Sequence, residues 1–518
     1  MSVRKVFQLL FAVSVIQAIT IVGNNAWAQS KALPPPSLAD FAAPFEDPLN
    51  AYPNHSIQHP ENLFTNKTAD CLIADQITQS HSPELAVQRF KEHAQEQNEN
   101  GQPILSLQMA LDLGLCHNPQ VRMTWSDIKL QASKIGQARA AYFPQLNVSI
   151  MPQRSIVDYS NQGTVTTEST SGNIGVSWRI LDFGIRSATL ESAYHQMAGA
   201  IHSQNETLQK SIIAILQTYY DALTQKSQWQ ARIQMQELAE QTLASAKRRL
   251  KNGAGSQNDV LQAQSSLSKA KLEVTTAYGN YQKTLASLIF QLGLPANTPI
   301  ELDDTLEQDM QAMLDTAFNS QQKILVEQGL QEWLDQARLA HPSIAAAKSR
   351  WMSAQSDVKA VSAQGLPTIE FGANHYRNGR PTDSASRIRS SETSVSLTVN
   401  IPLFSGFEHT YRVRGAQAQA ERAKLEVDAI EQQVMLELIH THADAQAAWH
   451  NLEDAENFYN SAALASESSR RQFENGVVDI TQVIQAQGFL IEAKTQKIEA
   501  YAQWQIAKMT LIVQSYAW

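Results

Sequence analysis

The chain reads RRLKNGAGSQNDVLQAQ at residues 248–264 and RQFENGVVDITQVIQAQ at residues 471–487, 223 positions further along. The same spacing separates the X-Pro dipeptides that end at Pro119 and Pro342. Matches at one spacing over so long a stretch are typical of a tandem duplication. The sequence therefore predicts two copies of one unit, which cover residues 105–293 and 326–518 and are joined by a polar linker at 294–325.

Each copy is expected to read helix, strand, loop, strand, long helix, tight turn and helix. In the strands, apolar residues alternate with polar ones, which is the pattern of a sheet with one apolar face. The strand segments lie near 145–150, 173–180, 368–373 and 394–401. Polar loops are expected between the strand partners, at about 155–171 and 377–392. This pattern suits a half-buried soluble sheet and equally a barrel with lipid outside and water inside.

Two segments without proline, Arg186–Lys251 and Glu408–Glu474, predict unusually long helices. At the usual rise per residue, a helix of this length extends for about 100 Å. After each Asn-Gly turn, apolar residues recur at alternating spacings of three and four, as at Val260, Ala263 and Leu267, which is the coiled-coil pattern. The sequence therefore predicts long antiparallel helical hairpins.

The N-terminal residues have the pattern of an export signal. Arg4 and Lys5 precede an apolar run, and Ala26-Trp27-Ala28 supplies a signal-peptidase site. We therefore assign residues 1–28 to a signal peptide and 29–104 to an N-terminal periplasmic extension. No later segment approaches the ~20 apolar residues of a spanning helix, so the mature chain is expected to be soluble or to cross a membrane as strands. The net charge of −9 argues against a nucleic-acid partner.

A sheet of four strands is too small to close on itself, since the smallest barrels have about eight strands. An open sheet edge is also incompatible with lipid, because its backbone groups have no partner there. Closure then requires several copies of the chain. Eight strands leave an interior filled by side chains, whereas the twelve strands of a trimer leave room for a pore. Helices of about 100 Å far exceed the ~30 Å hydrocarbon core and would project into the periplasm.

The chain resembles the TolC-like outer-membrane efflux and secretion family over nearly the whole mature sequence. The stretches that carry the resemblance are LSLQMALDLGLCHNPQVRMTWSDIKLQASKIGQARAAYFPQLNVS (106–149), VSWRILDFGIR (176–186), AHPSIAAAKSRWMSAQSDVKAVSAQGLPTIEF (340–371) and VSLTVNIPLFSGF (395–407). The resemblance implies a mainly α fold with transmembrane β-structure: a homotrimer with a twelve-strand β-barrel and a twelve-helix tunnel.

The same resemblance implies location in the outer membrane and a function as the exit duct of a tripartite export system, for protein or small-molecule cargo. The implied partners are outer-membrane lipid, a periplasmic adaptor and an inner-membrane transporter, either an ABC transporter or a proton-driven pump. The block around Cys116 looks most like family members that serve type I protein secretion. Two other functions remain open, namely a drug or metal efflux duct and a periplasmic coiled-coil adaptor or scaffold.

In the resembling family, the helix hairpins close the periplasmic end, and an acidic pair after the second turn lines it. In this chain the matching positions hold Gln482 and Gln485, which puts a double aspartate ring in doubt. Asp479, one helical turn earlier, offers a single ring. The alternative for Asp479, and also for Asp259, is a carboxylate favoured at a helix N-terminus, and we prefer this interpretation for both. The residues expected to face an adaptor are those of the turns: Asn252, Gly253, Asn475 and Gly476.

Two further pairs of residues are candidate sites. Arg179 and Glu370 are expected to face the lumen of the barrel and to influence passage, although charges on any solvated face fit the same pattern. Cys71 and Cys116 are expected to form a disulfide, since two thiols in an exported chain usually pair. Neither a catalytic motif nor a cofactor or metal motif is found in the sequence. We therefore expect no enzyme activity.

Overall fold

The computed structural model of the chain describes residues 104–160, 163–303, 329–377 and 391–515. All of them belong to one compact unit, Pro48–Trp518. The predicted signal peptide, the predicted N-terminal extension up to residue 103 and residues 304–328 of the predicted linker lie outside the described residues. Cys71 also lies outside them, and the disulfide to Cys116 therefore stays a prediction.

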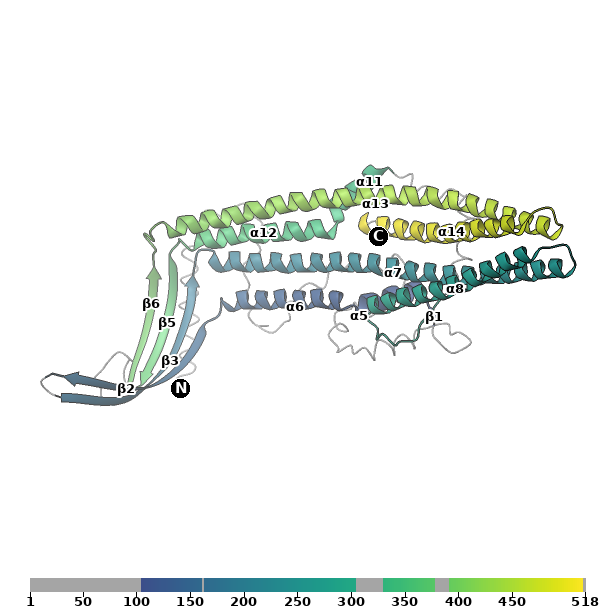
Figure 1. The fold of residues 1–518 in the computed structure, drawn as a ribbon. Helices are drawn as coiled ribbons and strands as arrows, with labels where there is room; N and C mark the ends of the chain where they lie inside the picture. The colour runs from purple at the N-terminus through teal and green to yellow at the C-terminus, as the bar shows by residue number, and fades with distance from the viewer. Residues whose placement is uncertain (1–103, 161–162, 304–328, 378–390, 516–518) are drawn as a thin grey trace, which may run out of the picture. The chain divides into compact units, whose positions relative to one another are not determined.

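Two helical hairpins dominate the described unit, as the proline-free segments predicted. Their long arms are α7 (Ile185–Lys251) and α13 (Glu408–Glu474), each of 67 residues. Their short arms are α8 (Gln257–Gln291) and α14 (Ile480–Ser515). In each hairpin the short arm returns alongside the long one (Figure 1).

Four shorter helices complete the helical part: α5 (Leu107–His117), α6 (Pro119–Ala140), α11 (Leu330–Ala340) and α12 (Pro342–Ala363). Helices α6 and α12 begin with proline, which is tolerated there because the first N–H of a helix has no intrahelical partner. The preceding residues cap these helices. Asn118 Oδ1 accepts a hydrogen bond from the Gln120 N–H at 2.8 Å, and His341 Nδ1 accepts one from the Ser343 N–H at 3.3 Å.

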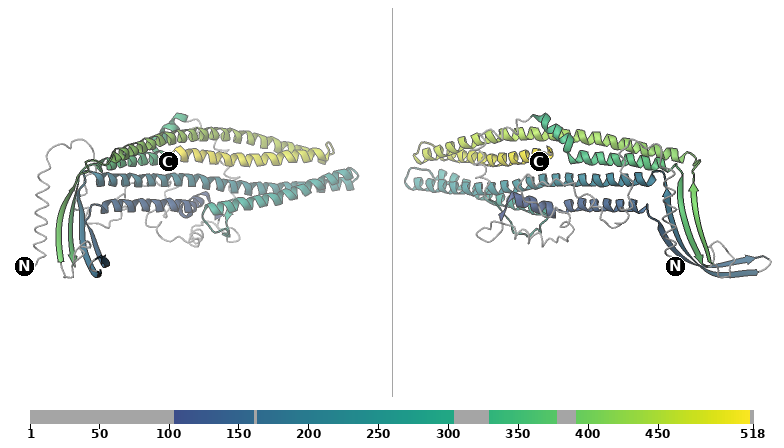
Figure 2. Two further views of the ribbon diagram at one scale, coloured as in Figure 1. Left: turned by 60° about the vertical axis from the view of Figure 1, so that its left-hand side comes forward. Right: turned by 180° about the vertical axis from the view of Figure 1, so that it is seen from behind.

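The helices lie roughly parallel to one another in four rows (Figures 1 and 2). The long arms α7 and α13 each form one row, and each of the other two rows, which we call columns, contains two helices. Helices α6 and α8 form what we call the first column, and α12 and α14, which follow one another end to end, form the second column. Helix α7 packs against the helices of both columns, and α13 packs against the second column. Corresponding helices of the two copies begin 223 positions apart, for example α6 at Pro119 and α12 at Pro342.

The core follows the seams predicted from the coiled-coil spacing. Near the middle of the rows, Ile215 and Leu216 of α7 and Trp504 of α14 are fully buried in the largest apolar cluster. Alanines such as Ala263 and Ala493 are buried along the short arms, where their small side chains let neighbouring helices approach closely. None of the described helices combines the length and the apolar character that a membrane span needs.

The four strands form one antiparallel sheet in the order β2-β3-β5-β6. Their bounds are β2 (Gln145–Tyr159), β3 (Gly163–Leu181), β5 (Thr368–Arg377) and β6 (Ser391–Asn400). The sheet lies at one end of the helical rows (Figure 1). Two short strands elsewhere, β1 (Ile104–Leu105) and β4 (Glu301–Leu302), pair in parallel.

The loop predicted at 155–171 is wrong for most of its length. Strand β2 continues to Tyr159 and β3 starts at Gly163, so the two strands stay paired beyond the last β3–β5 pair, Gly172 with Arg377. The polarity of this segment predicts a loop. The segment is also rich in threonine and valine, whose branched side chains favour an extended backbone, and cross-strand pairing there does not require an apolar face.

Candidate functional site at the hairpin ends

The two hairpin turns have the same backbone geometry. Gly253 and Gly476 lie in the left-handed region, at φ +74° and +78°, which glycine adopts without the penalty of a Cβ atom. The Gly253 N–H donates to the Leu250 carbonyl at 3.0 Å, and the Gly476 N–H donates to the Phe473 carbonyl at the same distance. Asn252 and Asn475, the preceding residues, are exposed at the helix ends. The duplicated sequence therefore folds into duplicated turns.

One arginine joins the two turns. The Arg249 guanidinium, at the end of α7, lies 4.7 Å from the ring centroid of Phe473, near the end of α13. Its Nη1 donates to the Phe473 carbonyl oxygen, and its Nη2 donates to the Ala254 carbonyl oxygen at 3.2 Å. The Phe473 ring is itself buried in an apolar cluster with residues of α7, α8 and α14. Arg249 therefore fastens the end of the first hairpin to the end of the second within one chain.

The sequence interpretation missed this contact. At the spacing of 223, Arg248 corresponds to Arg471, but Arg249 corresponds to Gln472 and Phe473 to Leu250. Arg249 and Phe473 thus both lie at positions where the two copies of the repeat have different residues. The signal in the sequence is that Arg249 and Phe473, although they lie beside matching turns, are not repeated in the other copy.

The acidic candidates both cap helices. Asp259 and Ser256 form a capping box at the start of α8, in which each side chain accepts a hydrogen bond from the backbone N–H of the other. Asp479 Oδ1 accepts a hydrogen bond from the Gln482 N–H at 3.0 Å at the start of α14. The side chains of Gln482 and Gln485 are exposed on the first turns of α14. A ring of Asp479 side chains would belong to an assembly and stays a prediction.

The end of α13, next to the second turn, carries a cluster of charged side chains. Glu467 accepts hydrogen bonds from Arg471 at 2.7 Å and from Arg470 at 2.9 Å, and Arg470 also binds Glu474 at 3.0 Å. These donors hold the pKa of the Glu467 carboxyl below its usual range. The group is exposed, so the cluster contributes little to stability, but it presents fixed charges of both signs beside the second turn.

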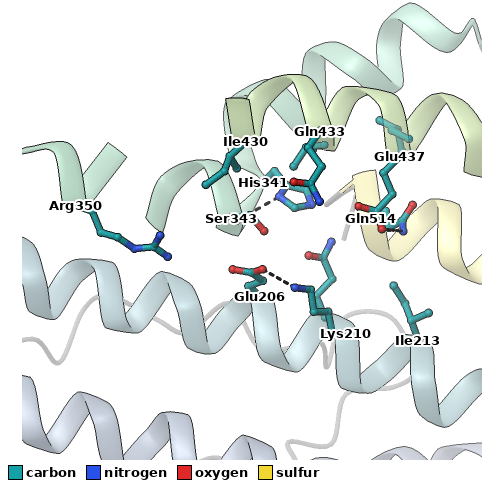
Figure 3. Close-up of a pocket in the computed structure, with 13 residues that line it drawn as sticks. Glu206, Lys210, Ile213, His341, Ser343, Arg350, Ile430, Gln433, Glu437 and Gln514 are labelled. Atoms are coloured by element: carbon teal, nitrogen blue, oxygen red, sulfur yellow. Dashed lines mark hydrogen bonds and ion pairs between the residues drawn. The ribbon is translucent and has the colours of Figure 1, made fainter. Parts of the chain in front are cut away.

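Farther along the rows, a cavity of about 260 Å³ lies where α12 begins and α14 ends, between α7 and α13 (Figure 3). Glu206 and Lys210 of α7 form an ion pair at 2.7 Å on one side of it. His341 lies on the opposite side, and burial lowers the pKa of its imidazole to about 4. Arg350 and Glu437 also line the cavity, so its formal charges balance. It has room for water or a small polar molecule.

In the sheet, the structure brings Arg179 and Glu370 together. They are cross-strand partners in β3 and β5, and Arg179 Nη2 lies 2.9 Å from Glu370 Oε1. The pair shares its face of the sheet with polar neighbours, while the other face exposes apolar side chains: Leu146, Val148, Ile150, Ile174, Val395, Leu397 and Val399. Within the described ranges, no cluster of three or more His, Cys, Asp or Glu side chains has the arrangement of a metal site.

Comparison with known proteins places this geometry in a family. The family model described as "Outer membrane efflux protein" matches residues 110–294 and 333–513. The chain belongs to the outer membrane efflux protein family. As a member of it, the chain is an outer-membrane efflux channel and not an enzyme, which confirms these two predictions.

Curated relatives of the chain include Protein CyaE of Bordetella pertussis, which is 30% identical over 410 residues, 79% of this chain and 83% of CyaE. The alkaline protease secretion protein AprF of Pseudomonas aeruginosa is 24% identical over 221 residues, 42% of this chain and 43% of AprF. Among solved structures, CusC matches with a TM-score of 0.65 at 16% identity, over 79% of this chain and 91% of that one. VceC of Vibrio cholerae matches with a TM-score of 0.62 at 16% identity, over 79% and 95%. These structural matches confirm the predicted mainly helical fold, in which long helical hairpins join an antiparallel sheet.

Proposed function

We propose that three copies of this chain form a closed duct that exports protein, with a periplasmic adaptor and an inner-membrane transporter as partners. The observation that carries the proposal is the four-stranded sheet, which exposes an apolar face and ends in two outer strands, β2 and β6. In lipid the apolar face is favourable, but the outer strands need backbone partners. Pairing β2 of one copy with β6 of the next supplies them, and three copies give about twelve strands, enough for a water-filled interior.

The helices extend this duct away from the membrane. Long arms of 67 residues are about 100 Å in length, several times the thickness of the hydrocarbon core. The hairpin turns then lie at the far end, where an adaptor and a transporter would engage Asn252, Gly253, Asn475 and Gly476. In this proposal Arg249 holds the resting end narrow, and engagement of the turns separates the hairpins.

Protein is the preferred cargo because of the relatives. AprF is named for the secretion of alkaline protease, and CyaE is similar over most of its length. The second candidate is efflux of small molecules, which the similarity to the outer membrane efflux protein BepC of Brucella suis favours: 24% identity over 433 residues. An ABC transporter is the expected engine for protein cargo, and a proton-driven pump for small toxic molecules.

Two measurements test the proposal. The mature protein is purified from outer membranes in detergent and reconstituted in planar lipid bilayers, where we expect ion-conducting channels and, on gels, an oligomer that dissociates only on heating. A deletion strain is then compared with the complemented strain for protein in the culture medium and for survival in toxic small molecules. Loss of secreted protein supports the preferred cargo, whereas loss of survival alone supports efflux. A water-soluble monomer without channel activity would contradict the duct itself.

A further inference from the structure

The two hairpin ends carry different net charges, although their turns have the same backbone geometry. Residues 244–259 at the end of the first hairpin include four basic side chains and one acidic side chain, which gives a net charge of +3. The corresponding residues 467–482 of the second hairpin include two basic and three acidic side chains, which gives a net charge of −1. The duplication therefore allows one end to be compared with the other, position by position.

At the second end, the chain neutralises its own arginines. The Glu467 carboxylate accepts hydrogen bonds from Arg471 at 2.7 Å and from Arg470 at 2.9 Å. A second carboxylate, that of Glu474, pairs with Arg470 at 3.0 Å. These residues lie three or four positions apart on α13, a spacing at which opposite charges attract. Both arginines of the second end are therefore held by carboxylates of their own helix.

At the first end, the two basic residues are kept and the two carboxylates are absent. The basic counterparts are Lys247 and Arg248, whereas Ala244 and Lys251 occupy the positions of the carboxylates. All four side chains are exposed. Among the described residues, no acidic side chain forms an ion pair with any of these three basic ones. The end of α7 thus presents basic side chains without the carboxylates that hold their counterparts.

The helix dipole alone does not explain this difference. Cations are favoured in the last turn of a helix, and the last turn of α7 has Arg248, Arg249 and Lys251. Helix α13 has the same dipole, but the basic residue of its last turn is Arg471, and the helix ends on a glutamate. Lys247 and Lys251 also lie four positions apart, where like charges repel one another. The first end therefore has its basic side chains despite a local cost.

The second end shows how a carboxylate fits between the two basic residues of the repeat, because Glu467 binds both arginines there. At the first end the corresponding place is open, since the Ala244 methyl group cannot accept a hydrogen bond from Lys247 or Arg248. A carboxylate from another molecule would find two charged donors in the same arrangement, and charge-assisted hydrogen bonds are the stronger ones.

We propose that the first hairpin end binds an acidic segment of the periplasmic adaptor through Lys247, Arg248 and Lys251, and that contacts of the second end do not depend on charge. A carboxylate of the adaptor takes the place at the first end that Glu467 takes at the second. The inference rests on the proposed function and names the chemistry of the adaptor surface that engages the first turn. Outer-membrane lipid does not reach this site, because a helix of 67 residues, about 100 Å in length, separates it from the sheet.

Exchanging the charges of the two ends tests the inference. Ala244→Glu/Lys251→Glu gives the first end the carboxylates of the second, and Glu467→Ala/Glu474→Lys gives the second end the side chains of the first. The purified mature oligomer in detergent is titrated with a fluorescent peptide of consecutive glutamates, and binding is measured by anisotropy. We expect the wild type to bind the peptide, and added salt to weaken this binding because it screens exposed charges. Ala244→Glu/Lys251→Glu should bind about tenfold more weakly or worse.

The reciprocal variant Glu467→Ala/Glu474→Lys should gain additional sites for the peptide, a result that misfolding does not produce. The matched control is Ser468→Glu/Gln472→Glu, which adds two carboxylates to exposed positions of the second end. We expect this control to bind the peptide as the wild type does. In cells, Ala244→Glu/Lys251→Glu should release less protein into the culture medium than the wild type, whereas the control should release as much.

The outcomes separate this inference from the proposed function. The inference is wrong if the wild type does not bind the peptide, or if Ala244→Glu/Lys251→Glu binds it equally well or secretes as the wild type does. Binding to vesicles of phosphatidylglycerol without binding to the peptide would also overturn it, in favour of a lipid surface. In each of these cases an oligomer with channel activity leaves the duct intact. A monomer without channel activity contradicts the duct, and the inference fails with it.

Discussion

Arg249 contributes three contacts from one guanidinium group: the Phe473 ring, the Phe473 carbonyl and the Ala254 carbonyl. A cation over an aromatic ring and a charge-assisted hydrogen bond are together worth about 2 kcal/mol. We expect Arg249→Ala to separate the hairpin ends and to raise single-channel conductance in planar bilayers. The exposed neighbour Arg248→Ala is the matched control and should conduct as the wild type does. Equal conductance of the two variants would mean that Arg249 does not restrict the opening.

Arg179 and Glu370 neutralise one another in the sheet at 2.9 Å. In a ring of three copies, Arg179→Gln leaves three carboxylates facing water, and we expect the reversal potential in a salt gradient to move towards cation selectivity. Glu370→Gln should move it in the opposite direction, and the double variant should return to the wild-type value. Identical potentials in all four proteins would show that the pair lies away from the ion path.

His341 makes stability depend on pH. Burial lowers its pKa to about 4, from 6.5, so between these values the unfolded chain binds more protons than the folded chain. The free energy of unfolding therefore has its full value with respect to His341 above pH 6.5. It falls by up to about 3 kcal/mol per chain as pH decreases towards 4. We expect His341→Asn, which copies the cap at Asn118, to lose less melting temperature between pH 7 and pH 4.5 than the wild type. The exposed His440→Asn should behave as the wild type does, and the idea fails if His341→Asn does not differ from it.

At the scale of elements, Asp479 at the start of α14 has two possible roles, as a helix cap and as part of a charged ring, and substitutions can distinguish them. Asparagine caps a helix about as well as aspartate does, whereas alanine costs about 1 kcal/mol. We expect Asp479→Asn to keep both the melting temperature and the wild-type response of channel conductance to divalent cations, and Asp479→Ala to lower the melting temperature. A weaker response to divalent cations in Asp479→Asn than in the wild type would instead assign Asp479 to a charged ring.

The sequence predicted those elements whose determinants are local. Proline at Pro119 and Pro342 and glycine at Gly253 and Gly476 set helix starts and turns, and the helices between them followed. The extension of β2 and β3 does not follow from polarity, which predicts a loop there, because cross-strand pairing can continue without an apolar face. The Arg249–Phe473 contact was missed because it joins residues far apart in sequence, and only the packing of α7 against the second hairpin brings them together.

At the scale of the whole molecule, a substitution of Phe290 tests whether its side chain is covered by another copy of the chain. Its side chain is 82% exposed in the single chain, and covering a phenylalanine contributes about 2 kcal/mol. We expect Phe290→Lys to lower the temperature at which the oligomer dissociates on gels, with the helix content by circular dichroism unchanged. Leu339→Lys is the matched control, since Leu339 is 88% exposed on α11, outside both columns and α13. Equal dissociation temperatures for the two variants would place Phe290 outside the contact between copies.

The unequal length of the two strand pairs has a consequence for the outer rim. Strands β2 and β3 continue past Gly172 and Arg377, where β5 ends (Figure 1). In a ring of three copies, the described parts of β2 and β3 would extend farther from the helices than the described parts of β5 and β6. Ser155 and Thr166 lie on these extended parts, so impermeable thiol reagents added to intact cells would label cysteines placed there before any on β5 or β6. This labelling would show which end of the protein faces the outside of the cell, and the cells would stay intact during the measurement.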